Sequence, residues 1–239
     1  LLKQLFLFDP LSIFFLIVIG IVSLPSAIYS IGYMRGEYKR GKCILAAALL
    51  IVFVFSMCMV VTAGNIFSFL VFWEIMSLVS YFLVIFDTKH VKSVQAGLIY
   101  IVMTHIGTAF LIGGFMILYK HANCLDFFTI KNICQTIPFQ TKNIIFLLLL
   151  VGFGTKAGIV PLHIWLPYAH PQAPSHISSI MSGVMIKTAI YGLIRFVIFI
   201  LGVNQTWWGS LVLVLATITC LAGIIYALME RDLKRLLAY

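Results

Sequence analysis

The chain has 239 residues, of which 62% are apolar and 10% are charged, and its mean hydropathy is +1.11. These values exclude a soluble globular domain and predict an integral membrane protein. We attribute the net charge of +9 to membrane topology and expect no nucleic-acid partner.

The apolar residues form seven continuous segments, and each is long enough for a helix that crosses about 30 Å of hydrocarbon with roughly 20 residues. Their continuity favours helices over barrel strands. We therefore expect an all-α, polytopic transmembrane helix bundle that forms a single domain over residues 1–239. In chain order, the predicted spans are 11–31, 43–63, 66–86, 96–119, 143–168, 175–201 and 208–228.

Basic residues in the short loops indicate the orientation, because Lys and Arg are retained on the cytoplasmic side. We expect the cytoplasmic side to hold Arg35, Lys39, Arg40, Lys42, Lys89, Lys92, Arg231, Lys234 and Arg235, and the outer side Lys3, Lys120, Lys131 and Lys142. The outer loop 121–142 is long enough for a short surface helix. The chain starts at Leu1 and stops in a charged turn, so we expect it to be part of a longer protein.

Glu74 lies inside the third predicted span, nine residues from its start. A charged side chain near a helix centre costs about 2.5–3.5 kcal/mol on insertion scales, so it persists mainly where it faces a bundle interior or a water-filled path. We expect Glu74 to face the interior, either in a structural ion pair or as a carboxylate whose charge switches during ion transfer. His105, in the fourth span, suits a packing hydrogen bond as well as a proton relay.

The fifth predicted span, 143–168, contains Lys156 and a predicted helix break at Gly154, Gly158 and Pro161. A proline removes a backbone donor and clashes with the carbonyl four residues earlier. Broken helices at membrane depth occur where the backbone is buried in protein or lines a cavity, and they recur at transporter ion sites. Lys156 and His163 are therefore candidate members of an ion path.

Lys187 lies in the sixth span, and His176 precedes it by eleven residues. At about 100° per residue, three helical turns place both side chains on one face. We expect Gly183 to leave space between them, although a glycine packing notch beside a snorkelling lysine would give the same pattern. Arg195, nearer the end of this span, is equally consistent with snorkelling and with burial.

No residue pattern points to a metal, a cofactor or a catalytic site in this chain. The five cysteines are scattered without a C-x-x-C pair, so neither a metal site nor an iron–sulfur cluster is expected. Nucleotide-binding loops and nucleophile motifs are also missing from the sequence. We expect a non-catalytic membrane subunit.

The segments "FWEIMSLVSYFLV" and "KAGIVPLHIWLPYAHPQAPSHISSIMSGVMIKTAIYGLIRF" resemble the antiporter-like membrane subunits of respiratory complex I and of membrane-bound hydrogenases, especially the large membrane subunit of the hydrogenase-4 and formate hydrogenlyase type. The resemblance implies the first inverted repeat of a fourteen-helix fold. It also implies that Glu74 and Lys156 form an electrostatic switch that modulates the proton affinity of Lys187. His163 and His176 would connect these residues to the cytoplasm.

The expected function is proton translocation by a subunit of a redox-driven complex in a bacterial or archaeal plasma membrane. Its partners would be the other membrane and peripheral subunits, the lipid bilayer, and protons or sodium ions. Two alternatives stay open: a subunit of a sodium-exporting cation/proton antiporter or of a bicarbonate uptake system, and a scaffold whose buried charges only hold helices together.

Overall fold

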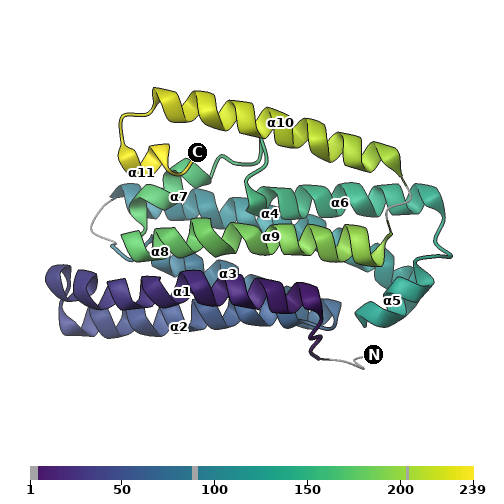
Figure 1. The fold of residues 1–239 in the computed structure, drawn as a ribbon, viewed down its shortest axis with the longest axis horizontal. Helices are drawn as coiled ribbons and strands as arrows, with labels where there is room; N and C mark the ends of the chain where they lie inside the picture. The colour runs from purple at the N-terminus through teal and green to yellow at the C-terminus, as the bar shows by residue number, and fades with distance from the viewer. Residues whose placement is uncertain (1–4, 88–90, 203–204) are drawn as a thin grey trace.

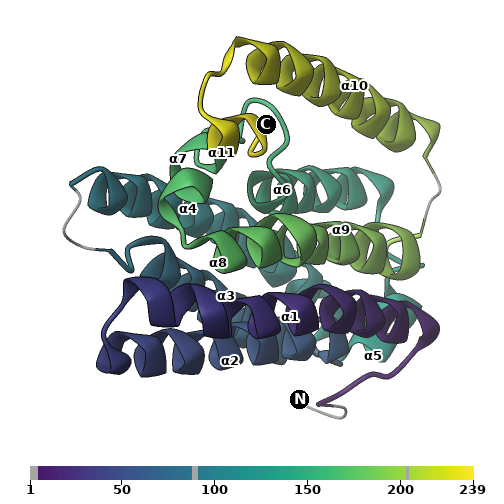
Figure 2. The ribbon, with the colours of Figure 1, turned by 60° about the vertical axis from the view of Figure 1, so that its left-hand side comes forward.

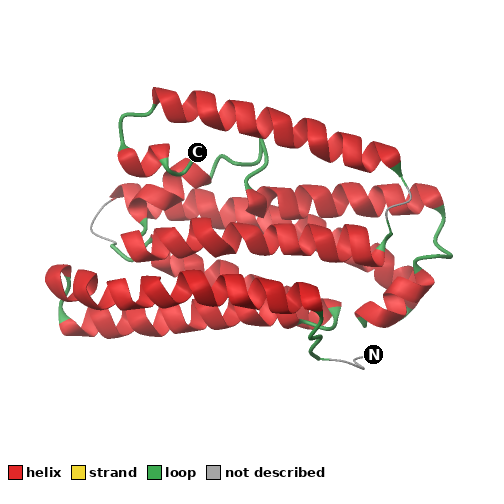
Figure 3. Cartoon of the chain, viewed as in Figure 1, coloured by secondary structure: helices red, strands yellow, loops and turns green. Residues whose placement is uncertain are grey.

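A computed structural model describes residues 5–87, 91–202 and 205–239. Lys3 and Lys89, which entered the predicted orientation, lie outside these ranges. Apart from two isolated β-bridges, all regular elements in the described ranges are helices (Figure 3), which confirms the predicted all-α class. They are α1 (Pro10–Glu37), α2 (Arg40–Thr62), α3 (Ile66–Val84), α4 (Val91–Ala122), α5 (Phe127–Ile133), α6 (Phe139–Ala157), α7 (Leu166–Gln172), α8 (Ser175–Ile180), the π-helical segment η1 (Met181–Met185), α9 (Ile186–Leu193), the π-helical segment η2 (Ile194–Ile200), α10 (Thr206–Met229) and α11 (Leu233–Leu236).

Six helices in the described part of the chain are long and apolar enough to cross a membrane: α1, α2, α3, α4, the continuous helix Ser175–Ile200, and α10. The predicted segment 143–168 is divided. Its first part lies in α6, its last part lies in α7, and residues 158–165 between them are not α-helical.

The long helices lie side by side, with α1 and α2 along one edge and α10 along the opposite edge (Figures 1 and 2). The centre of the bundle is aromatic. Phe196 lies 4.6 Å from Phe115 and 5.1 Å from Phe69, measured between ring centroids. Along α10 only Trp208 is buried, and it stacks on Phe146 at 4.5 Å.

Polar residues fix the starts of three helices. Asp9, Asn65 and Asp126 each accept a backbone hydrogen bond from the residue three positions on, which satisfies one of the N–H groups that a helix start leaves without a partner. Asn65 and Gly64 also form the short turn between α2 and α3. The N–H of Gly64 donates to the carbonyl of Leu5 and its carbonyl accepts from the N–H of Phe127, so this turn joins the N-terminal segment to α5.

Helices α4 and α6 cross in close contact, which positions the candidate site. A Cβ atom added to Gly152 would lie 2.9 Å from the carbonyl oxygen of Gly107, and one added to Gly107 would lie 3.1 Å from the carbonyl oxygen of Gly152. Small residues of this kind let membrane helices approach until their backbones touch. Lys156, one turn after Gly152, is therefore held against α4.

Candidate functional site

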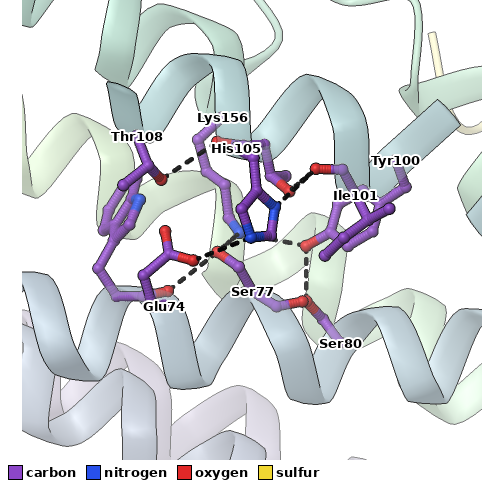
Figure 4. Close-up of polar contacts among 10 residues, drawn as sticks. Glu74, Ser77, Ser80, Tyr100, Ile101, His105, Thr108 and Lys156 are labelled. Carbon is purple, nitrogen blue, oxygen red and sulfur yellow. Dashed lines mark hydrogen bonds and ion pairs between the residues drawn. The ribbon is translucent and has the colours of Figure 1, made fainter. Parts of the chain in front are cut away.

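Lys156 lies one residue before the end of α6, and its side chain is only 2% exposed. Its Nζ atom donates to the hydroxyl oxygen of Ser77 at 2.7 Å and to that of Tyr100 at 3.1 Å. The Tyr100 hydroxyl also lies 2.5 Å from the hydroxyl of Ser80. Figure 4 shows this arrangement, in which α3, α4 and α6 each contribute to one polar cluster.

No carboxylate within 4.0 Å pairs with Lys156 among the described residues. Its ammonium group instead lies 5.6 Å from the ring centroid of Trp73 and 5.4 Å from that of Tyr100. Burial disfavours a charged ammonium, whereas hydroxyl oxygens and aromatic faces favour it. These contacts therefore offset part of the cost of burying the Lys156 ammonium group.

Glu74 is half-buried at the edge of the bundle, with 36% of its side chain exposed. Its Oε2 atom lies 3.5 Å from Nε2 of His105, a residue whose side chain is 55% exposed. Its Oε1 atom is buried and has no hydrogen-bond partner in the described ranges. An acceptor that is buried without a partner is costly, so this geometry leaves Glu74 ready to accept a further donor or a proton.

His105 contacts both a backbone carbonyl and the Glu74 carboxyl group. Nδ1 of His105 lies 2.9 Å from the carbonyl oxygen of Ile101. A carbonyl only accepts, so Nδ1 must carry a proton. Nε2 can then contact the Glu74 carboxyl group favourably only if one more proton lies on either partner. Nε2 of His105 and Oε2 of Glu74 face each other across this 3.5 Å contact (Figure 4).

Glu74 faces the interior only in part. The buried stripe of α3 runs through Trp73, Ser77 and Ser80, and Glu74 is about 100° around the helix from Trp73, so its Oε1 atom is buried while 36% of its side chain is exposed. Its ion pair within the described residues is with His105 on α4 and not with Lys156. Ser77 lies one turn beyond Glu74 on α3 and binds Lys156, so the two charged groups belong to neighbouring parts of one cluster.

The chain leaves the α-helical conformation after Ala157, one residue beyond Lys156. Gly158 has a φ angle of +80°, and a Cβ atom there would lie 2.3 Å from Cδ1 of Leu166. The backbone groups freed by the break have partners: the N–H of Val160 donates to the hydroxyl of Thr219 on α10 at 3.1 Å, and the indole N–H of Trp165 donates to the carbonyl of Thr155 at 2.8 Å.

The other members of the predicted break have different surroundings. Gly154 lies inside α6, and its carbonyl accepts the N–H groups of Gly158 and Ile159 at 2.9 Å. Pro161 lies in the non-helical segment three residues after Gly158 and is exposed. His163, two residues further on, is partly buried, and its Nδ1 atom has no partner in the described residues. It lines a cavity of about 30 Å³ next to Gly158 and Thr219, which is large enough for a water molecule.

Lys187 and His176 do not share a helix face, contrary to the sequence prediction. The π-helical segment η1 lies between them, and its i→i+5 hydrogen bonds change the angular register that the α-helical spacing assumes. His176 is 2% exposed, whereas Lys187 is exposed and donates from Nζ to the carbonyl of Ser182 at 2.5 Å. Gly183 leaves no space between them, because it packs on α1, where an added Cβ atom would lie 3.0 Å from Val22.

Sequence reasoning missed the hydroxyl groups that hold Lys156. Ser77, Ser80 and Tyr100 lie in apolar stretches and carry no charge, so hydropathy gives them no weight. The spacing of Ser77 and Ser80 from the buried Trp73 was an available signal, because all three fall on one face of α3.

For Arg195, the structure decides between snorkelling and burial. Its side chain is 4% exposed and pairs with Asp9 at 2.5 Å, so it is buried and does not snorkel.

Two family descriptions match the chain. Residues 63–239 match the family described as NADH:quinone oxidoreductase/Mrp antiporter, TM. Residues 3–42 match the family described as NADH-Ubiquinone oxidoreductase (complex I), chain 5 N-terminus. The first match alone covers more than half of the chain and includes Glu74, Lys156 and Lys187.

Curated relatives match nearly the whole chain. It is 38% identical over 233 residues to hydrogenase-4 component B of Escherichia coli (strain K12), with 97% of this chain and 34% of that protein covered. It is 33% identical to formate hydrogenlyase subunit 3 of the same organism, with 97% and 36% covered. It is 32% identical to a putative antiporter subunit, mnhA2, of Staphylococcus saprophyticus, with 98% and 29% covered. The chain thus spans about a third of the length of these relatives.

Proposed function

The chain belongs to the NADH:quinone oxidoreductase/Mrp antiporter membrane family, and on that premise we propose that it moves protons as part of a membrane subunit of a redox-driven complex of the hydrogenase-4 type. The reaction that releases the energy takes place in other subunits. This chain supplies side chains that accept and release protons inside the membrane, namely Glu74, Lys156, Lys187, His163 and His176.

The polar cluster around Lys156 is the observation that carries this proposal. A scaffold lysine would gain most from a close carboxylate, but Lys156 contacts two hydroxyl groups and two ring faces. Hydroxyl groups can both accept and donate, so Ser77 and Tyr100 are able to pass a proton as well as bind one. Moving one elementary charge across 100 mV costs about 2.3 kcal/mol, which rearrangement of a few buried charges is able to supply.

Further subunits would cover the charged groups that the described chain leaves at its surface. Glu74 and His105 are half-exposed between apolar helix faces, and Lys187 is exposed on α9. Charged side chains at membrane depth face protein or water rather than lipid. We propose that neighbouring subunits of the complex, or further parts of the same protein, pack over both positions. The expected location is the plasma membrane of a bacterium or archaeon.

An alternative function is cation/proton exchange without redox chemistry. The 32% identity to a putative antiporter subunit favours it, and a bicarbonate uptake system would use the same membrane chemistry. In either case the ion would follow a gradient, whereas in the redox-driven complex its movement requires electron transfer.

The test uses the whole complex, reconstituted into proteoliposomes and driven by its redox substrate. We expect acidification of the lumen that does not depend on sodium, and its loss in Glu74→Gln and Lys187→Met variants that keep the redox rate in detergent. Acidification that requires sodium but no redox substrate would support the antiporter alternative. Wild-type acidification in both variants would show that these charged groups are structural.

A further inference from the structure

A cavity of about 590 Å³ opens between the C-terminal end of α1, the N-terminal end of α2 and the start of α8. Ile31, Ile44 and Leu50 form an apolar wall, and Arg35 and Arg40 lie at the same cavity. This volume is within the range of cavities that bind small organic ligands. The cavity is separate from the cluster around Lys156 and shares only His176 with the proposed proton path.

The two arginines are available for a ligand. Both side chains are exposed, and neither guanidinium has a carboxylate within 4.0 Å in the part of the chain that the structure describes. The nearby Lys42 differs from them, because its ammonium group lies over the rings of Tyr38 and Phe86 at 5.6 and 5.7 Å. Guanidinium groups bind phosphate oxygens in a forked geometry, so a phosphate fits this pair of arginines.

From the helix lengths we expect the cavity to lie where the hydrocarbon of a bilayer gives way to its headgroups. Helix α1 has 28 residues and is therefore about 42 Å long, which exceeds the roughly 30 Å of hydrocarbon. About 20 residues counted from Pro10 end near Ser30, so Arg35 and Arg40 lie at headgroup depth. Leu50 is ten residues further along α2 than Arg40 and thus about 15 Å deeper. The polar and apolar parts of the cavity match the two parts of a phospholipid.

His176 supplies an independent sign of a ligand at this position. It lines the cavity and is 2% exposed, and its Nδ1 atom is buried without a hydrogen-bond partner in the described ranges. The aromatic neighbour of His176 is Tyr33, with the two ring centroids 5.7 Å apart. Buried polar atoms normally have a partner, so the imidazole of His176 leaves one hydrogen bond unmade beside this cavity.

We propose that this cavity binds one anionic phospholipid, with its phosphate at Arg35 and Arg40 and an acyl chain along Ile31, Ile44 and Leu50. Basic pockets between transmembrane helices on the cytoplasmic side are known to suit anionic headgroups. A lipid here would also close the space beside His176. The site is a lipid-binding site and not part of the redox chemistry.

The test measures lipid bound to the purified complex by mass spectrometry, after extraction in a mild detergent and exchange with phosphatidylglycerol or phosphatidylcholine of the same chain length. We expect the wild type to retain phosphatidylglycerol at least tenfold more strongly than phosphatidylcholine. The double variant Arg35→Gln/Arg40→Gln should lose this preference. Lys39→Gln is the matched control, because Lys39 is an exposed base of the same loop that does not line the cavity, and it should behave like the wild type.

A second variant separates a lipid from a free phosphate. Ala47→Trp narrows the apolar part of the cavity without changing any charge, so it should weaken retention of phosphatidylglycerol. Inorganic phosphate at 10 mM should fail to displace the lipid. Equal lipid retention in the wild type and the double arginine variant would overturn the proposal, as would a wild-type complex without bound lipid. If phosphate displaced the lipid and Ala47→Trp retained phosphatidylglycerol as well as the wild type does, the site would be a phosphate site instead. None of these results depends on proton transport.

Discussion

Arg195 and Asp9, 186 positions apart in the chain, form a two-pronged ion pair with N–O distances of 2.5 and 2.7 Å. Arg195 also donates to the hydroxyl groups of Ser12 at 3.0 Å and Tyr191 at 3.1 Å. The pair joins the start of α1 to η2, at the end of the bundle that we expect to face outward. Tyr191 comes from α9, one turn before Arg195.

Removing either charge of this pair should destabilise the protein. Asp9→Asn leaves a 4% exposed guanidinium without its carboxylate, and breaking a buried pair costs about 3–5 kcal/mol. Asp9 is 27% exposed, so Arg195→Met should cost less than Asp9→Asn. The melting temperature of the detergent-solubilised protein measures both changes. The double variant Asp9→Leu/Arg195→Met should lose less than the sum of the single losses, and strict additivity would show that the pair is not coupled.

Acid should remove the contribution of Asp9. Burial raises the pKa of this carboxyl group, but hydrogen bonds from Arg195 and Ser12 outweigh burial and hold the pKa well below its usual value. A depressed pKa stabilises the folded state above the unfolded pKa of about 3.9 and stops doing so as the pH falls through the folded value. The difference in melting temperature between the wild type and Asp9→Asn should therefore be constant from pH 7 to 5 and shrink below about pH 4. A difference unchanged at pH 3 would contradict this.

Tyr100→Phe should slow proton transport without unfolding the bundle. The variant removes a hydroxyl that binds both Lys156 and Ser80 and leaves the ring in place. A lost hydrogen bond to a charged group is worth about 1.5–3 kcal/mol, so we expect roughly a tenfold or greater fall in redox-driven acidification. Tyr81→Phe is the control, because the Tyr81 hydroxyl makes no hydrogen bond with the residues that the structure describes. Equal rates in the two variants would remove Tyr100 from the proposed path.

His105→Leu should impair transport if Glu74 and His105 share a proton. The variant removes the neighbour of Oε2 and adds no charge. We expect the acidification rate to fall several-fold. His121→Leu, at the exposed end of the same helix, should leave the rate unchanged. An unaltered rate in His105→Leu would show that Glu74 works without it.

Gly158→Ala tests whether the broken helix needs its glycine. A φ of +80° disfavours any side chain, and the added Cβ atom would lie 2.3 Å from Leu166. We therefore expect the variant to lower the free energy of unfolding by more than about 1 kcal/mol. Gly20→Ala is the control, because a Cβ atom there meets nothing within 4 Å, and it should be neutral or slightly stabilising. Equal melting temperatures would mean that residues 158–165 adjust freely.

The sequence was a good guide wherever a property depends on neighbouring residues along the chain. Hydropathy predicted the helical class because membrane insertion sums local transfer free energies, and the long motifs around Glu74 and Lys156 were enough to indicate the family. The caps at Asp9 and Asn65 are likewise local, since each side chain bonds a backbone group three residues on.

Only the tertiary structure decided which groups meet. The partners of Lys156 are Ser77 and Tyr100, which lie 79 and 56 positions earlier in the chain, and no local pattern links them to it. The same holds for the contact of Glu74 with His105 and for the pair of Asp9 with Arg195. The register between His176 and Lys187 failed for a related reason: one π-helical segment turns the following residues away from the face that α-helical spacing predicts. The sequence thus determined that the chain lies in a membrane and which segments form helices. Packing between distant helices determined which polar groups meet, because a hydrogen bond requires the donor and acceptor to be placed within a few tenths of an ångström, and spacing along a helix does not specify this.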